Sequence, residues 1–191
     1  MKKLLTLLVV PLILSGCLGI GEEEEAIGEP AAGEIKYSHT NFSILIPQDW
    51  EIIEKADFTS NVPAEVIVDF RNNIKSEIFT ANLSISATNV EEGISASDLA
   101  ISSKTKAEDS LVSFEGISSK KIDIPYGESF VNGERVTFSG KKNASDPIIY
   151  FEQIYVINNG VGYIVTAASL VEEDETVVNY LDRMLNSFAL K

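Results

Sequence analysis

The single cysteine of this 191-residue chain, Cys17, stands at the end of an apolar N-terminal stretch. The stretch begins with Lys2 and Lys3, continues through mostly apolar residues and closes on Ser15-Gly16 before the cysteine. A charged start, an apolar middle and small residues at the end are typical of a secretory signal peptide. A thiolate is a good nucleophile for alkylation, so this thiol is a candidate for covalent attachment. A single cysteine also excludes a disulfide within the chain.

Leu14-Ser15-Gly16-Cys17 resembles, at every position, the lipobox of prokaryotic lipoproteins. The resemblance implies a diacylglyceryl thioether on Cys17 and cleavage before it, which makes residues 1–16 a lipoprotein signal peptide. Two acyl chains matter because each buried methylene contributes about 0.8 kcal/mol and one chain anchors only marginally. The alternative is an uncleaved membrane span, but a span needs about 20 apolar residues and this stretch is shorter. We expect a lipid anchor at the extracytoplasmic face of the cell membrane.

Few other residues have the types and spacing that catalysis needs. His39 is the one histidine, and it lies in the polar sequence Tyr-Ser-His-Thr, so we interpret it as a surface residue rather than the base of a hydrolase triad. The chain has no Gly-x-Ser-x-Gly elbow, phosphate-binding loop, HExxH helix or EF-hand loop. We interpret Trp50 as a core residue and Glu172–Glu175 as the start of a helix. We expect no catalytic residue, no metal and no cofactor.

Three asparagines, Asn41, Asn82 and Asn143, each begin an Asn-x-Ser sequon. Asparagine and serine are both abundant in this chain, so three sequons could arise by chance. They are candidate glycosylation sites only in an organism that glycosylates its exported proteins.

Composition divides the rest of the chain into a linker and one domain. Residues 17–34 are rich in Gly, Glu, Ala and Pro, which indicates a flexible acidic linker, and Glu22–Glu25 is a solvated spacer rather than a metal site. Residues 35–191 have the size of one domain. The formal net charge of −14 argues against nucleic acid as a partner, because phosphate backbones bind through Lys and Arg.

Alternating apolar and polar residues predict β-strands through much of the domain. Pro47 ends the first strand because it cannot donate to a ladder, and Asn158-Asn159-Gly160 tolerates the positive φ of a tight hairpin. We expect a connection that includes Asn132-Gly133 between two later strands. The predicted strands are Phe42–Ile46, Ala64–Phe70, Asn82–Thr88, Lys120–Tyr126, Glu134–Gly140 and the two arms of a hairpin over residues 148–169.

Two helices are predicted beside these strands. The first begins at Ser95-Ala-Ser-Asp98, a hydroxyl three residues before a carboxylate, and runs to about Leu111. The second follows Glu172–Glu175 and has one apolar face, formed by Val177, Leu181, Met184 and Phe188. The strands come as neighbouring runs, so we expect an α+β fold with an antiparallel sheet and helices packed on it.

Three segments resemble PsbP-like domains: FSILIPQDW, YFEQIYVINNGVGYIVTAAS and NYLDRMLNSFAL, within Tyr37–Leu190. The resemblance implies an antiparallel sheet flanked by helices, an α/β/α sandwich. The group includes extrinsic photosystem II subunits, a Ran-binding branch and many prokaryotic lipoproteins, and it supplies no common catalytic residue. Histidines proposed as metal ligands in photosynthetic members have no counterpart here beyond His39, which puts a photosynthetic role in doubt.

Two function hypotheses follow. In the first, the chain is a non-catalytic module that binds or assembles another envelope protein. In the second, it is a small envelope enzyme, such as a carboxylate-based hydrolase, or a ligand-capturing receptor. A pocket with two facing carboxylates would favour the hydrolase, and a shallow apolar surface would favour the binding module.

Overall fold

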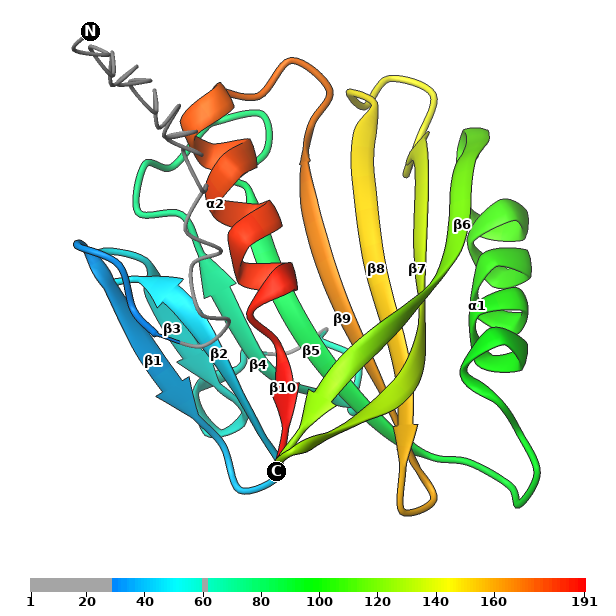
Figure 1. Ribbon diagram of the computed structural model, residues 1–191. Helices are drawn as coiled ribbons and strands as arrows, with labels where there is room; N and C mark the ends of the chain where they lie inside the picture. The colour runs from blue at the N-terminus through cyan, green and yellow to red at the C-terminus, as the bar shows by residue number, and fades with distance from the viewer. Residues whose placement is uncertain (1–28, 60–61) are drawn as a thin grey trace, which may run out of the picture.

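A computed structural model describes residues 29–59 and 62–191 of the chain (Figure 1). Its ten strands form one sheet, in the spatial order β1-β2-β10-β6-β7-β8-β9-β5-β4-β3. Among these residues, no helix has the length and apolar character needed to cross a membrane. In sequence order the elements are β1 (Glu34–Ser38), β2 (Phe42–Pro47), β3 (Glu51–Glu54), the 3-10 helix η1 (Lys55–Asp57), β4 (Val66–Arg71), β5 (Asn82–Asn89), α1 (Ala96–Ser110), β6 (Val112–Tyr126), β7 (Ser129–Lys141), β8 (Ile149–Asn158), β9 (Val161–Leu170), α2 (Glu175–Asn186) and β10 (Ala189–Leu190).

The sheet curls strongly, so that its two terminal strands, β1 and β3, lie near each other (Figure 1) and are linked by a side-chain hydrogen bond. Tyr37 in β1 donates from its hydroxyl to the Glu54 carboxylate in β3, at 2.8 Å. Strand pairing is antiparallel throughout, except that Leu190 of β10 pairs in parallel with Tyr126 of β6. The curl therefore gives the sheet a concave inner face, which surrounds the main core.

The two helices lie on opposite faces of the sheet. Helix α2 packs on the inner face, where Leu181, Met184 and Leu185 are buried in the main core. Helix α1 packs on the outer face against β6, β7 and β8, where Ala100 joins a smaller core with Phe138 and others. The α+β class is confirmed, but a sheet flanked by helices overstates the architecture, because α1 covers only part of the outer face.

Local sequence signals account for both helix starts. Ser95 and Asp98 form the expected capping box, with each side chain accepting a hydrogen bond from the backbone N–H of the other. Asp174 caps α2 by accepting from the backbone N–H of Thr176. The apolar face of α2 is confirmed at Leu181 and Met184, whereas Val177 is only partly buried. Phe188 is 1% exposed although it lies beyond the end of α2.

The expected connection at Asn132-Gly133 is wrong. The chain turns instead at Gly127-Glu128, and Gly133 lies inside β7, paired with Ile122. A Cβ atom at Gly133 would lie 3.0 Å from the carbonyl oxygen of Tyr155, so this glycine serves a close approach of strands rather than a turn. The predicted hairpin between β8 and β9 is confirmed, with positive φ at Asn159 (51°) and Gly160 (76°).

Candidate binding site

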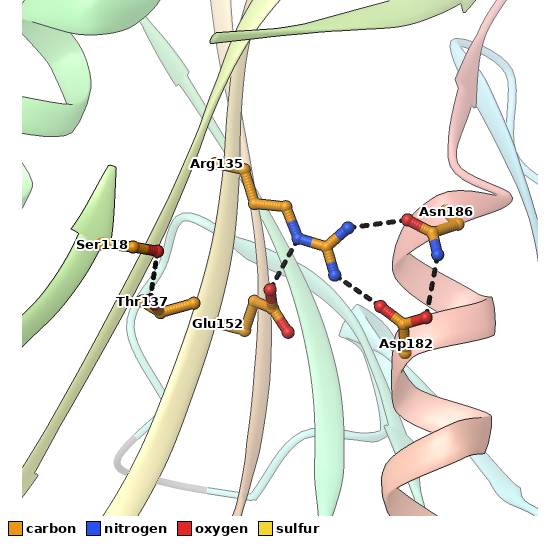
Figure 2. A network of polar contacts seen from close by, with 6 residues as sticks. All are labelled: Ser118, Arg135, Thr137, Glu152, Asp182 and Asn186. Atoms are coloured by element: carbon orange, nitrogen blue, oxygen red, sulfur yellow. Dashed lines mark hydrogen bonds and ion pairs between the residues drawn. The ribbon is translucent and has the colours of Figure 1, made fainter. Parts of the chain in front are cut away.

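A partly buried ion network joins α2 to the inner face of the sheet (Figure 2). Arg135 in β7 is 9% exposed. Its guanidinium donates from Nε to Glu152 at 2.6 Å, from Nη2 to Asp182 at 2.6 Å and from Nη1 to Asn186 at 2.7 Å. Burial alone would lower the pKa of Arg135, but the two carboxylates more than offset it and the pKa is raised. The arginine therefore stays charged and ties the helix to β7 and β8.

The space beside this network is small. A pocket of about 40 Å³ is lined by Tyr150, Glu152, Ser169 and Asp182, together with apolar residues of β9 and α2. Pockets that bind small molecules typically measure about 300–1,000 Å³. Glu152 and Asp182 are also bridged by the same guanidinium. We infer that this network mainly fixes the position of α2.

A hollow of about 420 Å³ lies beside β3 and β4, and two smaller ones lie on the outer face, between α1 and β6. One has a volume of about 280 Å³ and the other about 270 Å³, and both are lined by Ser97 of α1. We call these two adjoining hollows the α1–β6 groove. Its lining residues are Ser95, Ala96, Ser97, Ala100, Ile101 and Lys104 from the helix side, and Ser119, Lys121, Asn132, Gly133, Glu134 and Val136 from the sheet.

A carboxylate held by hydroxyl groups lies in the wall of the α1–β6 groove. Glu134 is 8% exposed. It accepts hydrogen bonds from Ser97 Oγ at 2.8 Å and from Ser119 Oγ at 2.5 Å. Buried polar groups normally have such partners, because an unpaired one is costly. The three residues come from α1, β6 and β7, so the hydrogen bonds also hold the helix against the sheet.

Two lysines bring positive charge to the same groove. Lys121 of β6 lies directly opposite Glu134 in the register of β6 and β7. Lys104 of α1 reaches toward β6, since its Nζ would lie 3.2 Å from a Cβ atom built on Gly116. Within the part of the chain that the structure describes, neither lysine is in an ion pair. Both ammonium groups remain available to a negatively charged partner.

Among the described residues, strand β6 next to the groove has one long edge with no partner strand over most of its length. Its other edge pairs with β7 over its whole length, but β10 reaches it at one residue pair, Leu190 and Tyr126. Its register with β7 shifts between Val112 and Glu115 and between Gly116 and Ser118, and is continuous beyond that point. Most β6 residues are exposed. The regular part of this edge therefore presents unpaired backbone groups to solvent along residues 118–124.

The sequence-predicted site residues lie outside this groove. Cys17 and the signal peptide fall outside the described residues. Asn41 is exposed in the turn between β1 and β2, and Asn143 is exposed between β7 and β8. Asn82 is half-buried in β5 and donates to the Thr80 carbonyl at 3.0 Å. Exposure therefore favours Asn41 and Asn143 over Asn82 as modifiable positions.

The other residues singled out from the sequence have structural surroundings. His39 stacks on Phe42, with ring centroids 4.7 Å apart, and its Nδ1 accepts from the backbone N–H of Asn41. Trp50 is 6% exposed and belongs to the main core, as expected. Asp174 has a lowered pKa because its carboxylate caps α2 at Thr176. These contacts assign His39 and Trp50 to packing and Asp174 to helix capping.

The groove itself was missed from the sequence. Its key residues, Ser97, Ser119 and Glu134, are widely separated along the chain and carry no motif. One signal was present: Glu134 and Arg135 are adjacent charges in a predicted strand, so they must point to opposite faces of a sheet. Each became the centre of a separate polar cluster, one on each face.

Comparison with known proteins identifies the fold. No family model matches the sequence, and no curated protein matches it. The solution structure of cyanobacterial PsbP (CyanoP) from Synechocystis is similar, with a TM-score of 0.61 at 18% identity over 93% of this chain and 99% of that one. LpqN from Mycobacterium tuberculosis gives 0.58 at 12% identity, covering 83% and 90%. The Ran-binding protein Mog1p from Saccharomyces cerevisiae gives 0.54 at 7% identity, covering 82% and 95%. These similarities show that the chain has a PsbP-like fold.

Proposed function

We propose that this chain is a non-catalytic binding or assembly module, held at the extracytoplasmic face of the cell membrane by a lipid on Cys17, whose partner is another protein of the cell envelope. The proposal draws on similar folds as well as on the sequence. Mog1p is a Ran-binding protein, and LpqN is involved in cell envelope biogenesis. Both descriptions are of those proteins, and they support a role in which the fold presents a surface rather than a reaction centre.

The α1–β6 groove is the observation that carries the proposal. It is open to solvent, it combines an exposed apolar side chain, Ile101 at 65% exposure, with hydroxyls and two lysines, and it adjoins an unpaired strand edge. Apolar and polar groups side by side on an open surface are typical of protein-binding sites. A reaction centre would more often enclose its substrate.

The arrangement of Glu152 and Asp182 supports a carboxylate-based hydrolase less well than the α1–β6 groove supports a binding module. Such an enzyme needs a pocket wide enough for its substrate between two carboxyl groups. Here both carboxylates bind the guanidinium of Arg135 at 2.6 Å, and the adjoining pocket is about 40 Å³. The pocket leaves little room for a substrate between the two carboxylates while Arg135 bridges them.

Crosslinking in intact cells tests the proposal. A photo-crosslinking amino acid is placed singly at three exposed positions in different parts of the fold, Ile74, Ile101 and Phe130. We expect at least one position to capture a single envelope protein in stoichiometric yield. In parallel, the purified protein is assayed against hydrolase and lyase substrates. Turnover that is lost in a folded E152Q/D182N variant would overturn the proposal.

A further inference from the structure

We propose that the free edge of β6 captures an extended acidic segment of the partner protein, which adds to the sheet as a further strand beside the α1–β6 groove. This inference rests on the proposed binding function and specifies its site, its geometry and the chemistry of the partner. Strand addition is a general mode of peptide recognition, in which main-chain hydrogen bonds give affinity and alternate side chains give specificity.

The edge has the length and regularity that strand addition needs. From Ser118 to Ile124 the pairing of β6 with β7 is uninterrupted, and β10 begins to cover the other edge only at Tyr126. In an antiparallel strand, alternate residues direct their N–H and C=O groups away from the existing neighbour. Pro125, which has no N–H, ends the useful stretch. A segment of about seven residues would therefore fit.

The groove supplies a place for side chains of the added strand. Ser119 and Lys121 line it from β6, and Ile101 and Lys104 line it from α1. An added strand lies about 4.8 Å beyond β6, and its alternate side chains point to the same face as those of β6. Every second side chain would therefore lie next to the mouth of the groove, within reach of Lys121 and the outward face of α1.

The lysines near the free edge favour a partner segment that carries negative charge. Lys120 and Lys121 are adjacent in the regular part of the edge and, because side chains alternate, they face opposite sides of the sheet. Lys104 adds a third positive charge on the α1 side. Two consecutive acidic residues in the added strand would pair with Lys120 and Lys121 at once, and opposite charges across a strand pair are stabilising. The overall charge of −14 opposes an acidic partner. Screening acts beyond about 8 Å, so a docked strand responds mainly to the charges of the edge itself, Lys120, Lys121 and Asp123, and the acidic pair must lie opposite the two lysines.

The same lysines disfavour a second copy of this chain on the edge. Antiparallel pairing of two β6 strands around their centre would set Lys120 and Lys121 of one copy against those of the other, and like charges across a strand pair are destabilising. Lysines in an edge strand commonly protect it from self-association. An acidic segment of a different protein would instead interact favourably with these lysines.

A designed peptide tests the inference on the full-length protein in nonionic detergent. The probe is a short fluorescent peptide of alternating threonine and valine with a central Glu-Glu pair, and its control has Lys-Lys at the centre. We expect only the Glu-Glu peptide to raise the anisotropy and to slow amide exchange at residues 118–124. The K120E/K121E variant should bind the Glu-Glu peptide roughly tenfold more weakly or worse and gain binding of the Lys-Lys peptide. The K141E/K142E variant, a second adjacent lysine pair, should behave like the unchanged protein.

Three outcomes would overturn the inference. The first is no binding, or protection of amides away from β6. The second is concentration-dependent dimerisation that K120E/K121E changes, which would assign the edge to a second copy. The third is tighter peptide binding when Glu22–Glu25 are all changed to Gln, which would assign the edge to the chain's own acidic segment. If the edge assignment failed but Ile74 or Phe130 still crosslinked to an envelope protein, the proposed binding function would remain supported.

Discussion

Arg135 is the buried charge on which the position of α2 depends. We predict that R135M lowers the free energy of unfolding by about 3 kcal/mol, within the range for removing one partner of a buried ion pair. The cost arises mainly at Glu152, whose side chain is 20% exposed and would lose its cation, whereas Asp182 is 54% exposed and can be hydrated. Chemical denaturation measures the loss.

Lys75 provides the matched control for this prediction. It pairs with Glu51 at 3.3 Å, but both side chains are largely exposed, at 64% and 46%. Exposed ion pairs contribute about 0–1 kcal/mol, so K75M should cost less than about 1 kcal/mol. Equal losses for R135M and K75M would show that burial of the network adds nothing to stability.

We predict that ionisation of the buried Tyr155 lowers the stability of the fold at high pH. Burial raises its pKa to about 12, although a hydrogen bond with Ser103 acts in the opposite direction. The folded state therefore holds the phenolic proton more tightly than the unfolded chain, whose tyrosine pKa is about 10. This contribution is complete below pH 10 and is lost as the pH rises toward 12, and two pKa units correspond to about 3 kcal/mol.

The Y155F variant tests that assignment. It cannot ionise, so its stability should fall less steeply between pH 10 and 12, even if it is lower at pH 7 because Gln153 loses the donated hydrogen bond. Tyr37 also has a raised pKa, from burial and from its contact with Glu54, so part of the alkaline slope should remain. An unchanged slope in Y155F would contradict the prediction.

Secondary-structure elements with strong local signals were the ones that the sequence could predict. The Ser95–Asp98 capping box, the apolar face of α2 and the turn at Asn159-Gly160 each depend on neighbouring residues. The strands β1, β3 and β10 and the first half of β6 were missed. They are short, exposed or bulged, so no clean alternation marks them. The α1–β6 groove was missed because tertiary packing alone brings its residues together.

Substitution of Phe188 tests how the residues just after α2 contribute to the main core. Its ring lies 5.6 Å from that of Phe42, centroid to centroid, and the residue is 1% exposed. We predict that F188A costs about 3–5 kcal/mol, as expected for deleting a buried aromatic ring. V178A on the exposed side of α2, where Val178 is 42% exposed, should cost less than about 1 kcal/mol. Similar losses for both variants would mean that Phe188 is not a core residue in solution.

At the scale of the whole molecule, the curl of the sheet places the main core and the proposed binding surface on different sides of the sheet. The inner face holds the main core and α2, whereas the α1–β6 groove and the free edge of β6 lie on the other side of the sheet or at its margin. Changes at Lys120 and Lys121 should therefore alter binding without disturbing the main core, and because K121E also sets a carboxylate opposite Glu134, the neutral K120Q/K121Q variant is the milder test. In Figure 1, β1 and α1 also lie at opposite sides of the molecule. A tether that enters the fold through β1 would leave the groove accessible.

The proposed attachment to the membrane would be a property of the whole molecule, and it would depend on Cys17, which lies outside the described residues. We predict that the mature protein begins at Cys17, carries two or three acyl chains and partitions into the detergent phase, because two chains hold a protein at a bilayer whereas one holds it only marginally. C17S removes the sulfur that the lipid requires, so this variant should be released or retain its signal peptide. L18S leaves Leu14-Ser15-Gly16-Cys17 intact and should stay attached. Intact mass spectrometry of both variants measures the N-terminus, and an unmodified N-terminus at another residue would contradict the lipid anchor.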